Sequence, residues 1–158
     1  MILLIGYGNT LRRDDGAGQV LARMIADRGE RNDLRLITVH QLVPELAWEL
    51  AAPGVAAAVF MDAAACPFPG AVSVSPLRVD VLADEPHPAP VFGHHFSPCH
   101  LLAYAGLLGD VRFPSWLVTI PARDFGLGEG LSRATASLLP PLAGEVLHLL
   151  RDLPETLP

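Results

Sequence analysis

Apolar and polar positions along the chain alternate between short strand-like runs and longer helical patterns. The apolar run over residues 2–5 stops at Gly6 and is typical of a strand buried on both faces. After Asp15, apolar residues recur at helical spacing up to Gly29. Comparable patterns predict four more strands, at 34–39, 55–61, 71–74 and 116–120. They also predict three more helices, over 44–50, over 98–108, and from a cap at Ser132 past Pro140 and Pro141.

Strands that alternate with helices in this way predict an α/β fold. We expect a three-layer sandwich, in which helices flank a twisted, mostly parallel sheet of about five strands. The length of 158 residues fits one domain, spanning residues 1–158. Ligands of open α/β sheets bind beyond the carboxyl ends of the strands. Candidate sites are therefore residues 6–15, Asp62, and the loop before the helix that Pro98 opens.

Composition narrows the class of protein. Hydrophobic residues make up 51% of the chain and charged residues 18%, which excludes a disordered chain. The net charge of -6 is opposite to that of a nucleic-acid-binding face or a polybasic membrane surface. No apolar run reaches the roughly 18 residues of a membrane span, and the start shows no secretory signal. We expect a soluble, cytoplasmic protein that binds neither nucleic acid nor membranes.

The stretch "GYGNTLRRDDGAG" after the first strand has two interpretations. Its Gly-x-Gly turn suggests a dinucleotide site, but the third glycine of that motif is replaced by Leu11. Asp14 and Asp15 would also repel a phosphate at a helix start. Aspartate there more commonly caps the helix. One carboxylate suffices for a cap, which leaves the other free to point into a cleft.

Asp62 and a pair of histidines complete the candidate site. Asp62 directly follows an apolar run, where a carboxylate either caps the next turn or binds a ligand. His94 and His95 come just before the helix that Pro98 opens. Carboxylate oxygens together with one imidazole suit a divalent transition metal such as nickel, zinc or iron.

Four segments, in order along the chain, resemble the motifs of the hydrogenase maturation proteases. These are endopeptidases that trim the large subunit of nickel-iron hydrogenases. The segments are "GYGNTLRRDDGAGQVLA", the strand ending in Asp62-Ala63, "HHFSPCHLLAYAGLLG" and "IPARDFGLGEGLS". Two positions differ from many members of the family: Asp15 stands where glutamate is common, and His95 where glutamine is common.

The resemblance implies a function and the roles of individual residues. The function is one cut near the C-terminus of the large-subunit precursor, made after nickel has been loaded. Asp15, Asp62 and His94, with His95 as the alternative register, would contact nickel carried by that precursor. Asp15 and Asp62 are then also the candidate catalytic residues, and Asp14 is assigned to the helix cap. We expect a monomer, because a protease of this kind needs only a transient encounter with the precursor.

Three mechanisms and two other functions stay open at this point. The metal could be a recognition element only, could also polarise the scissile carbonyl, or could assist an aspartate that acts as general base. The chain could instead be a nickel carrier or sensor, or a nucleotide-binding α/β domain. Cys99 lies in the first turn of a predicted helix, which could lower the pKa of its thiol, although packing is the more common role of such a cysteine.

Overall fold

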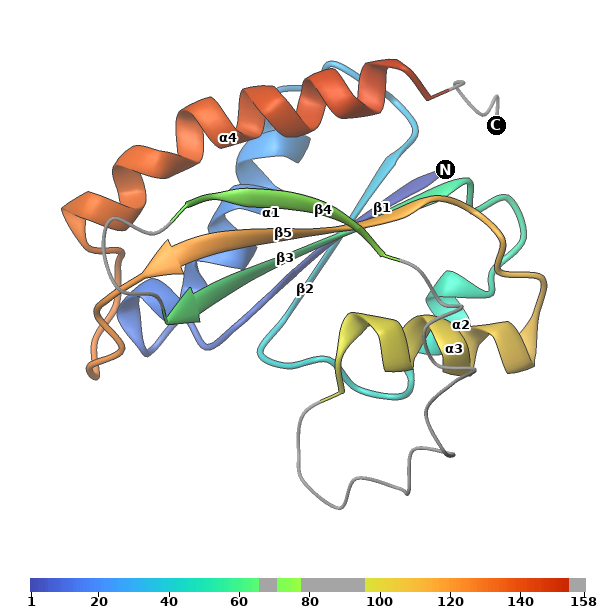
Figure 1. Cartoon of the computed structure of the whole chain (residues 1–158), viewed down its shortest axis with the longest axis horizontal. Coiled ribbons are helices and arrows are strands. Elements are labelled where there is room, and N and C mark those ends of the chain that lie inside the picture. Colours follow the sequence, from blue (N-terminus) through green and yellow to red (C-terminus); the bar gives the residue numbers. More distant parts are fainter. Residues whose placement is uncertain (66–70, 78–95, 154–158) are drawn as a thin grey trace.

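The computed structural model describes residues 1–65, 71–77 and 96–153 (Figure 1). The strands are β1 (Ile2–Tyr7), β2 (Leu34–Val39), β3 (Ala57–Ala65), β4 (Ser73–Leu77) and β5 (Ser115–Ala122). The helices are the short 3-10 helix η1 (Arg13–Gly16) and α1 (Ala17–Asp27), α2 (Leu46–Leu50), α3 (Pro98–Leu108) and α4 (Arg133–Arg151). Across these ranges, no helix is both long and apolar enough to cross a membrane.

The five strands form one sheet in the order β2-β1-β3-β5-β4. Neighbouring strands pair in parallel except for the edge strand β4, which pairs antiparallel with β5. The carboxyl ends of β1, β2, β3 and β5 therefore meet at the same edge of the sheet. The predicted α/β fold with a mostly parallel sheet is confirmed.

Two hydrophobic cores cover the two faces of this sheet. One core lies between the sheet and helices α1 and α4, and the other lies between the sheet and helices α2 and α3 (Figure 1). Successive side chains of β1 alternate between them, so Ile2 and Leu4 join the first core while Leu3 and Ile5 join the second. Burial on both faces explains why β1 is apolar at every position over 2–5.

The strand boundaries correct three predictions. β3 does not stop before Asp62 but continues to Ala65, because β5 still pairs with it from Asp62 onward. β5 is longer than predicted for the same reason. β4 is shifted toward the C-terminus and includes Pro76, which the prediction had used as its boundary. An edge strand tolerates this proline because one side of its backbone needs no pairing.

The helix ends agree more closely with the sequence. Ser97 caps α3 by accepting a hydrogen bond from the N–H of His100, and Pro98 takes the first helical position. Gly109 ends α3, as predicted. Ser132 caps α4 by accepting a hydrogen bond from the N–H of Thr135. These ends depend on local contacts, which is why the sequence alone predicts them.

Candidate functional site

The glycines of the first motif allow close approach of protein backbone. Gly8 has a φ of +127°, and a Cβ there would collide with the carbonyl oxygen of Asp15. A Cβ on Gly18 would collide with the carbonyl oxygen of Met61 in β3, and one on Gly6 would lie 2.5 Å from the carbonyl oxygen of Gly18. Helices η1 and α1 are thereby held directly against the ends of β1 and β3. This packing accounts for the Gly-x-Gly turn without a bound phosphate.

Replacing Gly18 with alanine is expected to destabilise the protein by about 2 kcal/mol or more, because the new methyl group meets two backbone carbonyls that cannot move aside. Urea unfolding measures the loss. The matched control is Gly144→Ala in α4, where an added Cβ meets no atom within 4 Å. There we expect a neutral or slightly stabilising effect, since alanine favours a helix. Equal unfolding free energies for the two variants would contradict the packing role of Gly18.

Asp15 is held at the carboxyl edge of the sheet by the turn that precedes it. Its carboxylate accepts a hydrogen bond of 2.8 Å from the backbone N–H of Asn9. The side-chain oxygen of Asn9 in turn accepts 2.9 Å from the N–H of Leu11, so the turn is fixed from both sides. A carboxylate has about four lone-pair positions, so the half-buried Asp15 keeps capacity for a ligand.

Asp62 lies in β3, one residue past the last pair that β3 forms with β1. Burial raises the pKa of Asp62 to about 6, and the charge of Asp15 adds to this effect. Hydrogen bonds from the Tyr7 hydroxyl and the backbone N–H of Ala63 oppose it. Asp15 and Asp62 are therefore close enough to influence one another. The structure brings together the two carboxylates that the sequence analysis selected.

Tyr7 belongs to this site, although the sequence analysis missed it. Burial raises the pKa of its hydroxyl, and the charge and hydrogen bond of Asp62 raise it further, as does the nearby thiol of Cys99. The sequence does contain one indication of this role: Tyr7 is the last residue of β1 and so lies at the same edge of the sheet as Asp62. The register of two strands 55 residues apart was needed to use that signal.

Cys99 is half-buried in the first turn of α3. Burial raises the pKa of its thiol, which favours the packing role over activation by the helix start. Packing remains the role that the structure supports for this residue.

His94 and His95 lie outside the described residues, as does Cys66. Within ranges 1–65, 71–77 and 96–153, no three His, Cys, Asp or Glu side chains are close enough to hold a metal ion. The donors that the structure does place are the carboxylate oxygens of Asp15 and Asp62. Their chemistry suits a divalent cation. The metal site, including Asp15 and Asp62 as two of its ligands and a histidine as the third, stays a prediction.

Asp14 does not cap the helix that follows it, which corrects the predicted role. Neither η1 nor α1 has a side-chain cap. The fully buried Asp14 carboxylate instead accepts hydrogen bonds from the start of α4 and from the two residues that directly follow β5. The donors are the N–H of Ser132 at 2.7 Å, the hydroxyls of Ser132 and Thr135 at 2.8 Å each, and the N–H groups of Asp124 and Arg123 at 3.0 and 3.2 Å.

Burial alone would raise the pKa of Asp14, but these hydrogen bonds outweigh it. Backbone N–H groups of Asp124 and Ser132 and the hydroxyls of Thr135 and Ser132 lower the pKa to about 2. Asp14 is thus a buried anion that joins the first and fourth sequence motifs. These contacts hold the start of α4 and the segment after β5 against the residue next to Asp15.

No protein-family model matches the sequence, and no curated protein matches it. Solved structures do. The HybD hydrogenase maturation protease of Thermococcus kodakarensis aligns with a TM-score of 0.69 and 21% identity over 94% of this chain and 97% of its own. The hydrogenase 2 maturation peptidase of Thaumarchaeota archaeon SCGC_AB-539-E09 gives 0.68 at 21% identity, with the same coverage. HybD of Escherichia coli gives 0.64 at 21% identity over 96% of this chain and 92% of its own.

The chain has the fold of the hydrogenase maturation proteases. The likeness covers 94–96% of this chain. It confirms the fold that the resemblance implied.

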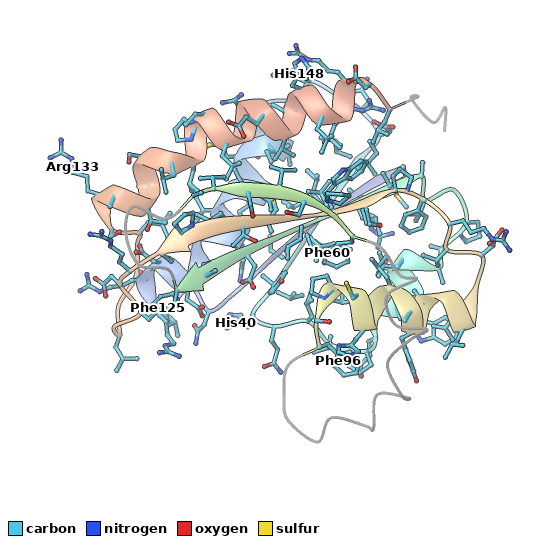
Figure 2. All side chains as sticks on the ribbon, viewed as in Figure 1. His40, Phe60, Phe96, Phe125, Arg133 and His148 are labelled. Carbon is cyan, nitrogen blue, oxygen red and sulfur yellow. The ribbon has the colours of Figure 1, made fainter. Side chains whose placement is uncertain are left out.

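In this maturation-protease fold, the first and fourth motifs also pair through their backbones. The N–H of Arg13 donates 3.0 Å to the carbonyl of Gly128, whose own N–H donates 2.9 Å to the carbonyl of Leu11. Arg13 forms an exposed ion pair of 3.2 Å with Asp124. Figure 2 shows Phe125 and Arg133 at this end of the molecule, and His148 far along α4. Arg13 therefore helps to hold this loop against the first motif.

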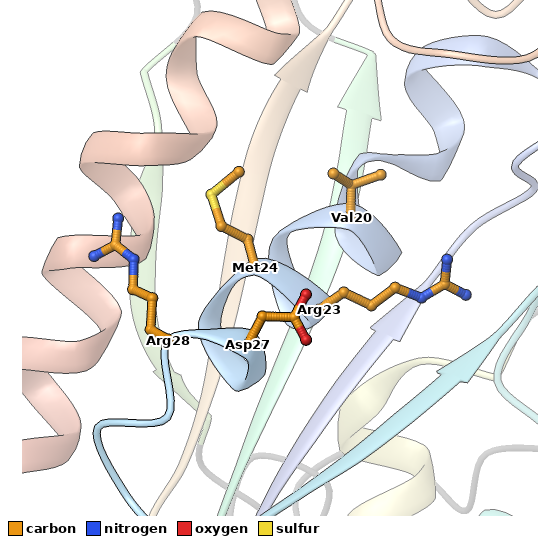
Figure 3. A pocket seen from close by; sticks show the side chains of 5 residues that line it. All are labelled: Val20, Arg23, Met24, Asp27 and Arg28. Carbon is orange, nitrogen blue, oxygen red and sulfur yellow. The ribbon is translucent and has the colours of Figure 1, made fainter.

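A groove of about 480 Å³ runs along α1, outside the carboxylate pair (Figure 3). Its lining residues are Val20, Arg23, Met24, Asp27 and Arg28. The guanidinium of Arg23 already donates to the side chains of Gln19 and Thr38, and that of Arg28 to the carbonyl of Pro140. Both cations are engaged in packing α1 against its neighbours, so the groove adds nothing to the candidate site of this maturation-protease fold.

Proposed function

We propose that the chain is an endopeptidase that removes the C-terminal extension of a nickel-iron hydrogenase large-subunit precursor after nickel has been loaded. The convergence of Asp15 and Asp62 at the carboxyl edge of a maturation-protease fold carries this proposal. Nickel is then part of the substrate. Asp15, Asp62 and His94, or His95 in the alternative register, contact it. The enzyme acts in the cytoplasm as a monomer.

The environment of Asp62 suits proton transfer during peptide hydrolysis. A general base works best when its pKa is close to the working pH, and burial raises the pKa of Asp62 to about 6 in the protein without its substrate. Asp62 takes a proton from the water that attacks the scissile carbonyl and returns it to the leaving amine. Asp15, fixed by the N–H of Asn9, keeps an oxygen for the substrate's metal. The precursor's nickel supplies the positive charge that brings the cleavage segment to these carboxylates.

Incubation with nickel-loaded and nickel-free precursor tests this function. We expect mass spectrometry to show loss of the C-terminal extension from the loaded precursor only. Loaded precursor that stays full length, while the protein still binds nickel, would instead support a nickel carrier or sensor. Equal cleavage of both forms would contradict recognition of the metal. Substituting His94 or His95 with alanine separately identifies which histidine is required.

A further inference from the structure

Tyr7 and Asp62 are neighbours on adjacent strands. Gly6 of β1 pairs with Met61 of β3, so the next residue of each strand lies at the same height in the sheet. Alternation along the strands turns both side chains toward the face covered by α2 and α3. Tyr7 packs there against the core that contains Leu3 and Ile5, and Phe60 precedes Asp62 on that face (Figure 2).

The strand register places the Tyr7 hydroxyl beside the Asp62 carboxylate, and a hydrogen bond between the two contributes to the pKa of each. The other hydrogen bond to this carboxylate comes from the backbone N–H of Ala63. Two of its roughly four lone-pair positions are thus occupied by groups on rigid strands, and the remaining ones are left for a ligand. The terminal torsion of an aspartate is otherwise broad, so these two bonds fix its rotation.

We propose that Tyr7 is a positioning residue for Asp62: its hydroxyl holds the carboxylate in the orientation that contacts the substrate's metal and water. For the reaction itself, this inference rests on the proposed function. The aromatic ring fills its place in the core, and phenylalanine would fill that place equally well. The hydroxyl is therefore what serves Asp62.

Tyr7→Phe tests the proposal, because it removes the hydroxyl and keeps the ring. Groups that orient a metal-contacting side chain typically change metal affinity or activity by 10- to 100-fold when lost. We expect calorimetric titration with nickel(II) alone to show about tenfold weaker binding. With loaded precursor, kcat should fall by about tenfold. The unfolding midpoint should stay close to that of the wild type.

The matched control is Tyr104→Phe, which makes the same chemical change on the exposed side of α3. We expect its nickel affinity and kcat to stay within twofold of the wild type. A double-mutant cycle then tests whether Tyr7 acts through Asp62. In an Asp62→Asn background, Tyr7→Phe should cause no further change in nickel affinity.

The failure of this inference differs from the failure of the proposed function. If the wild type cleaves loaded precursor and Tyr7→Phe matches Tyr104→Phe in both nickel affinity and kcat, Tyr7 has no positioning role. A further loss of affinity in the Asp62→Asn background also overturns it. If the wild type binds nickel but cleaves nothing, the protease function fails and the affinities still decide the role of Tyr7. Absence of both nickel binding and cleavage in the wild type overturns both proposals.

Discussion

Asp62→Asn is expected to abolish cleavage of the loaded precursor and, at the same time, to raise the stability of the protein. Burial raises the pKa of this carboxyl from 3.8 to about 6, so the fold disfavours its ionised form. Stability is therefore lost as the pH rises from about 4 to about 6, and at pH 7 the cost is about 3 kcal/mol. Asparagine removes the charge and keeps an oxygen for the hydrogen bonds of Tyr7 and Ala63.

Thermal unfolding and cleavage assays measure the two effects on the same samples. At pH 7 the variant should melt at a higher temperature than the wild type, and the difference should vanish near pH 4, where the wild-type carboxyl is also protonated. The matched control is Asp27→Asn, the same change on the exposed side of α1, which should leave both properties unchanged. Cleavage at the wild-type rate would remove Asp62 from the active site. A lower melting temperature would give it a structural role instead.

Asp14→Asn is expected to lower the free energy of unfolding by about 3 kcal/mol or more. Five donor groups converge on the Asp14 carboxylate. An asparagine amide would place an N–H₂ group against some of them, whichever way it is turned, and leave buried donors unpaired. Urea unfolding measures the loss. Asp110→Asn is the control, because that carboxylate forms an exposed ion pair with Arg112, a kind worth at most about 1 kcal/mol.

The same contacts predict that the wild-type protein loses stability at low pH. The pKa of Asp14 is lowered from 3.8 to about 2, so its contribution is complete above about pH 4 and is lost as the pH falls toward 2. The loss amounts to about 2 kcal/mol. Asp14→Asn has no carboxyl to protonate, so the difference in stability between the two proteins should shrink over this range. A difference that stays constant from pH 5 to pH 2 would contradict the role of Asp14 as a buried anion.

Local signals in the sequence predicted much of the fold. Apolar runs between polar or glycine residues located all five strands, and Pro98, Gly109 and Ser132 marked helix ends correctly. The boundaries of β3 and β4 were wrong because they depend on how far β5 continues as a partner. A neighbouring strand can extend pairing past a charged residue such as Asp62, or hold a proline at a sheet edge, and neither is visible in local periodicity.

The candidate site, like the fold, could be predicted from the sequence only in part. Asp15 and Asp62 could be selected from the sequence because each follows an apolar strand run, and parallel strands present those positions at one edge of the sheet. The role of Asp14 could not be predicted, since its donors lie 109–121 residues further along the chain. An aspartate before a helix has the same local pattern whether it caps that helix or a distant one.

The sequence by itself determined the α/β fold, and it selected the sheet edge and the two carboxylates, Asp15 and Asp62, of the candidate site, because these follow from hydrophobic periodicity and strand order. Tertiary structure alone decided what surrounds those carboxylates. The register of β1 and β3 places the Tyr7 hydroxyl on Asp62, and the docking of the loop before α4 turns Asp14 from a presumed cap into a buried support. Hydrogen bonds and burial set the pKa values of Asp14 and Asp62, and both arise from residues that only the folded chain brings together.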